Sequence, residues 1–285
     1  MLKIILSIML FLIVLPFNIY AEQSTITEAE GYACAGDDKS RKQTEKDSYD
    51  DAKRNAVDNA LSYIKTETKV KDFQVEKDIV QAYSNATVKV IEVKERRWYK
   101  DERSGDCHKT ILKAEIIPDE KAMKELATSK VAEDDPALPL SVKIWTDKKD
   151  YKSKEKVKIL LKGNKPFYAR VLYINAHGET LQLLPNPYRI DNYFLGGVVY
   201  EIPSGKDRFE LEVSPPFGEE NIVVYASSTE LGDIKVKKAG AVYQVITGAD
   251  DVGVKTRGVA LKEKTAGSKT AESFFEGKAV INTAQ

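Results

Sequence analysis

The stretch YDDAKRNAVDNALSYI, from Tyr49 to Ile64, has a strongly helical pattern. Its apolar residues recur every three or four positions, so they form one stripe along a helix, while charged and amide side chains fill the other face. The alanines of this stripe would let the helix lie close to a sheet. Before it, Ser40 and Gln43 have the spacing of a capping box. The stripe consists of Tyr49, Ala52, Ala56, Val57, Ala60, Leu61 and Ile64.

The segments on either side of this helix are typical of strands. We expect one strand before the helix, at residues 25–35, and two longer strands after it, at 86–100 and 107–117. A second, short helix is expected between them and the first helix, at 76–84. The loop between the two longer strands contains Gly105 and indicates a hairpin. A helix on one face of a small antiparallel sheet is the α+β pattern, which we predict for residues 22–119.

A second domain of different character follows. Residues 120–139 end in the acidic, proline-broken EDDPALP and are predicted to be a linker. From 140 to 285, short strands with Gly and Pro turns predict an all-β, sandwich-like domain. We expect a hairpin over 166–185, two strands within 207–227 and a final strand from Phe274; residues 232–269 show no clear pattern.

The chain begins with the pattern of an export signal. Lys3 supplies a positive charge, an apolar run extends from Ile4 to Phe17, and the small Ala21 precedes Glu22. This order is typical of a secretory signal peptide over residues 1–21, and the run is shorter than the ~20 residues that span a bilayer. We expect cleavage after Ala21 and a periplasmic or secreted mature protein without a transmembrane segment.

Two cysteines, Cys34 and Cys107, are present. In an oxidising compartment, such a pair most simply forms a disulfide, which we predict. The alternative is a nucleophilic pair of Cys107 and His108, but adjacent residues on a strand point to opposite faces.

Composition and motifs indicate a binding protein rather than an enzyme. Basic and acidic residues number 44 each, and the resulting net charge of zero argues against a general nucleic-acid binder. Only two histidines occur, and HExxH, paired CxxC, GxSxG and Walker motifs are absent from the sequence. We therefore expect no catalytic residues, no cofactor and no metal site.

The most distinctive string is PNPYRIDNYFLGG, residues 185–197, for which two interpretations stay open. Its proline, asparagine and aspartate residues favour an ordered loop that bonds to its own backbone. Aromatic and arginine side chains are also favoured contact residues. In the second interpretation, the loop therefore binds a ligand or partner through Tyr188, Arg189, Asp191, Asn192 and Tyr193. Two interpretations also stay open for the lysine-rich residues 143–165. They form either a binding site for acidic envelope polymers or a solvated strand face.

Both halves of the chain resemble known families. The ordered motifs LSVKIWTD, LLPNPYRIDNYF and PPFGEENIVVYAS resemble a bacterial domain-of-unknown-function family found in envelope proteins and beside Ser/Thr kinase domains. This resemblance implies a secreted, β-rich module without assigned catalysis. The first half, through DAKRNAVDNA and its paired strands, is similar to the N-terminal domain of the flagellar assembly protein FlgT and of small exported lipoproteins. It lacks the lipid-bearing cysteine of those lipoproteins.

These features together predict an exported, non-enzymatic envelope protein that acts as a binding or assembly module for other proteins or envelope polymers. The alternative is a periplasmic receptor for a small molecule or a glycan that uses the 186–194 loop.

Overall fold

The computed structural model describes residues 22–36, 39–67, 73–123, 134–240, 242–257 and 271–285. The predicted signal peptide and part of the 232–269 segment lie outside these ranges. None of the helices in the described ranges is long and apolar enough to cross a membrane.

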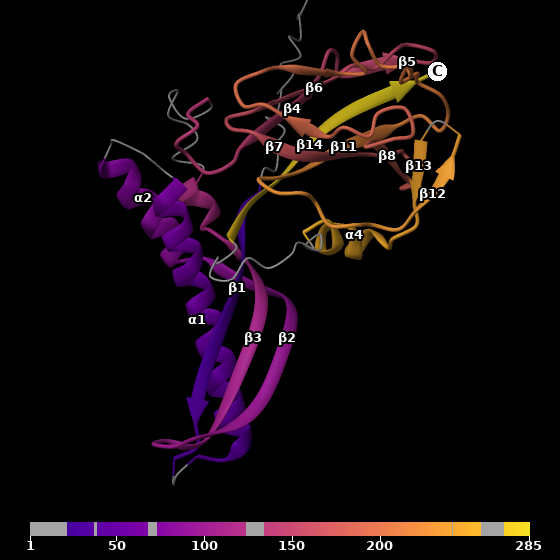
Figure 1. Ribbon diagram of the computed structural model, residues 1–285. Helices are drawn as coiled ribbons and strands as arrows, with labels where there is room; N and C mark the ends of the chain where they lie inside the picture. The colour runs from indigo at the N-terminus through magenta and orange to yellow at the C-terminus, as the bar shows by residue number, and fades with distance from the viewer. Residues whose placement is uncertain (1–21, 37–38, 68–72, 124–133, 241, 258–270) are drawn as a thin grey trace, which may run out of the picture.

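The first part of the chain is a long helix packed on an antiparallel sheet, as predicted (Figure 1). The strand β3 lies between its neighbours β1 and β2. The helix α1 packs along β1 and β3 and contacts the shorter α2. In chain order the elements are β1 (Glu22–Cys34), α1 (Arg41–Glu67), α2 (Phe73–Ser84), β2 (Thr87–Asp101) and β3 (Gly105–Ile117).

The alanine stripe of α1 lies directly against the sheet. Ala52, Ala56 and Ala60 are completely buried and pack with residues of β1 and β3. Close approach also requires Gly31 on β1, because a Cβ atom there would lie only 2.1 Å from the backbone nitrogen of Ala52. At the helix start, Ser40 Oγ accepts the backbone N–H of Gln43 at 3.2 Å, which satisfies one of the free donors of the first turn.

The second part of the chain is a β-rich region in two layers. The smaller layer is the three-stranded sheet β10-β6-β4, and its buried residues share a core with β7, β8, β11 and β14 of the larger sheet. This arrangement confirms the predicted sandwich-like architecture. Its elements are β4 (Val142–Thr146), β5 (Asp150–Lys152), β6 (Ile159–Gly163), β7 (Phe167–Ile174), β8 (Thr180–Leu184), β9 (Tyr193–Phe194), β10 (Tyr200–Ile202), β11 (Glu219–Ser227), β12 (Val236–Ala239), β13 (Val242–Val245), α4 (Ala249–Thr256) and β14 (Ala271–Ala284).

The strands at the centre of the larger sheet are covered on both faces. On β11, Ile222 and Val224 face the sandwich core, whereas Val223 and Tyr225 belong to a separate cluster with Ile26 of β1. A strand with two covered faces carries a continuous apolar run instead of a simple alternation. This explains the string NIVVYAS in β11.

The last strand joins the two parts of the protein. The first half of β14 pairs antiparallel with β1, and its register continues along β11 from Phe274 to Asn282. The larger sheet therefore runs without interruption in the order β12-β13-β8-β7-β11-β14-β1-β3-β2. Figure 1 shows β14 reaching from the side of β1 into the sandwich.

Buried charges reinforce this junction. Arg257, which caps the C-terminal end of α4, is 6% exposed and lies 2.6 Å from Glu115 of β3 and 2.8 Å from Glu276 of β14. Its backbone carbonyl accepts a hydrogen bond from Lys113 Nζ at 3.2 Å. The end of α4 is thus bound to strands from both parts of the chain.

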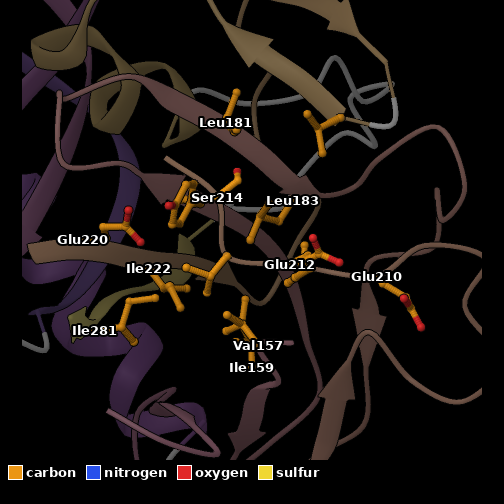
Figure 2. A pocket seen from close by; sticks show the side chains of 14 residues that line it. Val157, Ile159, Leu181, Leu183, Glu210, Glu212, Ser214, Glu220, Ile222 and Ile281 are labelled. Carbon is orange, nitrogen blue, oxygen red and sulfur yellow. The ribbon is translucent and has the colours of Figure 1, made fainter. Parts of the chain in front are cut away.

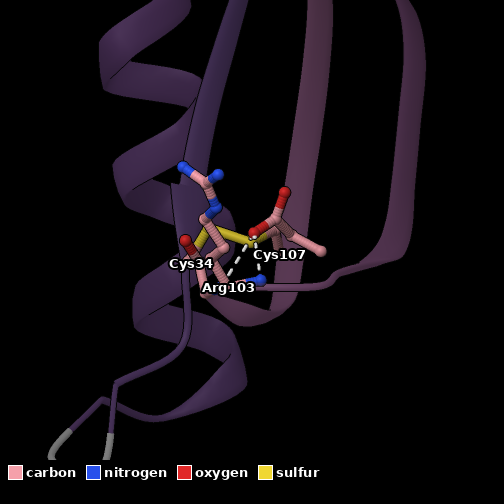
Figure 3. The surroundings of a disulfide bond; sticks show 5 residues. Cys34, Arg103 and Cys107 are labelled. Atoms are coloured by element: carbon pink, nitrogen blue, oxygen red, sulfur yellow. Dashed lines mark hydrogen bonds between the residues drawn. A yellow bond between two sulfur atoms is a disulfide. The ribbon is translucent and has the colours of Figure 1, made fainter.

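The predicted disulfide is confirmed. Cys34 and Cys107 are directly opposite each other on β1 and β3 and are bonded at an S–S distance of 1.98 Å. Figure 3 shows the bond beside Arg103, in the turn between β2 and β3. The crosslink closes a loop of 73 residues, which would contribute roughly 4 kcal/mol by restricting the unfolded chain.

One strand assignment was wrong. Of the two strands expected within 207–227, only β11 forms. The preceding residues make an isolated bridge between Glu212 and Lys156, and the backbones of Val213 and Glu155 bond nearby. The segment FELEVS alternates like a strand, but it meets an irregular partner before β6 and does not extend into a ladder.

Candidate functional site

The candidate site is the segment after β8, which begins with a turn organised by Asn186. This side chain is buried, and its Oδ1 accepts the backbone N–H groups of Tyr188 at 2.8 Å and Arg189 at 2.9 Å. Its Nδ2 donates to the carbonyl of Leu183 at 2.7 Å. The local bonding expected of an asparagine in a turn is therefore present.

Arg189 fixes the turn to a second loop. Its guanidinium lies 3.0 Å from Asp207 and 5.5 Å from the centre of the Phe194 ring. Asp207 also accepts the backbone N–H of Ser204 at 2.7 Å. Both partners of the ion pair are mostly buried, so this arginine holds the loop in place.

Asn192 attaches the segment to the sheet, and Asp191 bonds within the segment. Asp191 Oδ1 accepts the backbone N–H of Tyr193 at 3.1 Å. Asn192 Nδ2 donates to the carbonyl of Ala169 at 3.1 Å, and the carbonyl of Asn192 accepts the N–H of Ala169 at 2.9 Å. The short strand β9 follows directly in the chain and pairs with the start of β7.

Aromatic and glycine contacts anchor the rest of the segment. Phe194 is completely buried and stacks on Phe167 with 5.3 Å between ring centres. A Cβ atom at Gly196 would lie 2.5 Å from Lys165 Cα, so the backbones touch where only glycine fits. Gly197 N–H also donates to the carbonyl of Gly163 at 2.8 Å.

Despite these anchors, the segment exposes an apolar surface. Within residues 188–199, which we call the apolar loop, six large hydrophobic side chains are 43% to 81% exposed. In the described part of the chain only three other large hydrophobic side chains are exposed, by 37% to 59%, and they lie far away in sequence at positions 32, 93 and 246. The six are Tyr188, Ile190, Tyr193, Leu195, Val198 and Val199.

The structure thus divides the five predicted site residues into two groups. Arg189, Asp191 and Asn192 bond to their own chain, whereas the rings of Tyr188 and Tyr193 are accessible. The five predicted residues did not include the exposed aliphatic side chains beside them. The sequence signal for these was the apolar string FLGGVVY directly after a run of turn residues.

The other candidate residues occupy structural positions. Cys107 is held in the disulfide, and His108 is buried with its Nδ1 at 2.7 Å from Ser48 Oγ, between α1 and the sheet. Burial lowers the pKa of His108.

Several lysines between 143 and 165 form ion pairs. The nitrogens of Lys148, Lys156, Lys158 and Lys162 each lie within 2.9 Å of a carboxylate. These partners favour the interpretation of a solvated, charge-balanced strand face over that of a polyanion site.

Comparison with known proteins places the candidate site within a family match. Residues 150–230 match the model of a domain of unknown function, DUF4384. The match agrees with the resemblance inferred for the C-terminal half, and it contains the whole apolar loop. No curated protein and no solved structure shows significant similarity to the chain.

Proposed function

We propose that this protein is an exported, non-enzymatic envelope module that binds another protein through the apolar loop. The observation that carries the proposal is the concentration of six exposed hydrophobic side chains on a short, firmly anchored segment. A contiguous exposed apolar patch is unfavourable in water and commonly marks an interaction surface.

The anchoring of the apolar loop supports a role in binding, in addition to the exposure of its side chains. A loop that is already held in one conformation loses little entropy when a partner docks. Asn186, Arg189 and Asn192 provide that fixation, while the neighbouring side chains remain available. Tyrosine is also among the residues that contribute most to binding at protein interfaces.

Export is supported by the signal-like first residues and by the disulfide, since such bonds persist mainly in oxidising compartments. A protein partner is favoured over a glycan because the polar side chains suited to sugar hydroxyls already bond within the chain. An apolar surface is also better matched to an apolar protein surface than to a charged polymer.

The test is a crosslinking pull-down of the mature protein from its native envelope, read by mass spectrometry. We compare the wild type with Leu195→Asp, which places a charge in the apolar loop. Ile246→Asp serves as the matched control, because Ile246 is also exposed but lies outside the loop.

We expect the wild type and the control to recover the same small set of partners and Leu195→Asp to lose them. Circular dichroism and melting curves establish that all three proteins are folded. Recovery of the same partners by Leu195→Asp would refute the assignment of the contact surface to this loop.

A further inference from the structure

A cavity of about 200 Å³ lies at one end of the sandwich. Residues of strands β7, β8 and β11 and of the segment 210–214 line it (Figure 2). Its lining is mainly aliphatic and includes Ile159, Leu183 and Ile222. An engineered cavity of ~150 Å³ in another protein holds benzene, so a space of this size fits an apolar body of about six carbon atoms.

One carboxyl group interrupts this apolar lining. Glu220 is 1% exposed and lines the cavity two residues before Ile222, on the same face of β11. The alternation of this strand places Ile222, Val224 and Ala226 in the sandwich core, so the position of Glu220 calls for an apolar residue. A buried carboxyl group there is costly unless it is paired.

The described residues leave this cost partly uncompensated. Glu220 Oε1 is buried and accepts no hydrogen bond from any described residue. Burial raises the pKa of Glu220, while the nearby hydroxyls of Tyr173 and Thr283 partly lower it. The carboxyl group therefore has capacity for one more hydrogen-bond donor.

The charges of the other lining residues favour a positively charged ligand. Glu210 and Glu212 lie on the side of the cavity away from Glu220, as Figure 2 shows, and both are exposed. Lys156 pairs with Glu210 at 2.7 Å, but none of the residues that line the cavity is basic. An anion would meet carboxylates at both ends, whereas an ammonium group would meet an open acceptor at the inner end.

We propose that this cavity binds a small amphiphilic cation, an alkyl- or arylalkylammonium whose charged nitrogen bonds to Glu220. Its apolar body would lie among Ile159, Leu183 and Ile222. The size of the cavity limits this body to about six to eight carbon atoms. This site is separate from the apolar loop, so the two proposals can fail independently.

The experiment is a calorimetric titration of the folded mature protein with three probes of equal length: hexylammonium, hexan-1-ol and hexanoate. We expect hexylammonium to bind at least about tenfold more tightly than hexan-1-ol, because hydrogen bonds to charged groups are the stronger ones. Hexanoate should show no measurable binding. Methyl NMR shifts at Ile222 and Leu183 locate the bound probe.

Two variants test whether Glu220 recognises the charge of the probe. Glu220→Gln keeps the shape of the side chain and should weaken hexylammonium binding by at least about tenfold. Glu219→Gln changes the adjacent, exposed carboxylate of β11 and should leave the affinity unchanged. Equal affinity for hexylammonium and hexan-1-ol, no binding of hexylammonium, or unchanged binding to Glu220→Gln would each overturn the proposal.

Discussion

At the scale of single residues, departures from a regular pattern carry most of the functional information. Glu220 occupies a core position of β11 where the alternation requires an apolar side chain. Ile190 and Leu195 show the opposite departure, since they are exposed beside completely buried Phe194. Neither departure increases the stability of the sandwich by burying apolar surface, and the two binding proposals rest on them.

Glu220 should make stability depend on pH. Burial raises its pKa in the folded protein above the unfolded value, near 4.5. A carboxyl with a raised folded pKa contributes stability that is fully present below the unfolded pKa and is lost as pH rises through the folded pKa. Glu220→Gln removes this loss, so its melting temperature should exceed that of the wild type most at neutral pH and least near pH 4.

Melting curves between pH 4 and pH 8 measure this difference. Glu219→Gln is the control, because it alters a neighbouring carboxylate that is exposed. A difference between Glu220→Gln and the wild type that stays constant, or that grows toward pH 4, would contradict the assigned direction of the pKa shift.

At the scale of elements, helix α1 depends on a close approach to β1. Gly31→Ala would place a methyl group 2.1 Å from the nitrogen of Ala52 and 2.2 Å from the carbonyl of Ser48. Since both atoms belong to the helix backbone, the helix would have to shift. We expect a loss of about 3 kcal/mol or more in the free energy of unfolding.

Denaturant unfolding of Gly31→Ala measures this loss, and Gly36→Ala is the matched control. A Cβ atom at Gly36 would have no neighbour within 4 Å. Equal stability of the two variants would show that the helix is not held against β1 at this point.

The elements also show how far the sequence could predict the fold. The alanine stripe predicted α1, and turn glycines predicted the β2–β3 and β7–β8 hairpins, because these signals are local. The pairing of β14 with β1 joins residues about 250 positions apart, and no local pattern specifies such a partner. The turn and aromatic residues of the 186–194 loop made it a candidate site in the sequence, but their pattern did not separate anchoring side chains from exposed ones.

Within β2, irregular pairing with β3 limits how far the faces of the side chains can be predicted from the sequence. Register shifts occur between Val90 and Glu92 and again between Val93 and Glu95. Each such irregularity changes the face to which the following side chains point. Up to these shifts the side chains still alternate, since Val88 and Val90 pack toward α1 while Ile91 packs against the cluster around Ile26.

At the scale of the whole molecule, β14 and Arg257 join the two parts of the protein into one unit. Arg257→Leu would leave the carboxylates of Glu115 and Glu276 beside a neutral side chain. Because Glu115 is completely buried, its uncompensated charge should cost about 3–5 kcal/mol of stability.

Equilibrium unfolding followed by both tryptophan fluorescence and far-UV circular dichroism tests this coupling. Trp98 lies on β2 and Trp145 on β4, so the fluorescence reports on both parts. We expect Arg257→Leu to lower the midpoint of a single transition. A second substitution, Glu115→Gln, should restore part of the loss, and a double variant no more stable than Arg257→Leu would contradict this account of the ion pair.

The most direct measurement for the central claim is site-specific photocrosslinking in the native envelope. A photoreactive amino acid replaces Ile190, which is 81% exposed in the apolar loop, or Ile246, which is 59% exposed outside it. The proposed function predicts a discrete protein adduct from position 190 that disappears when Leu195→Asp is added, and no such adduct from position 246. No adduct from position 190, or the same adduct from both positions, would contradict the proposal that the apolar loop is the binding surface.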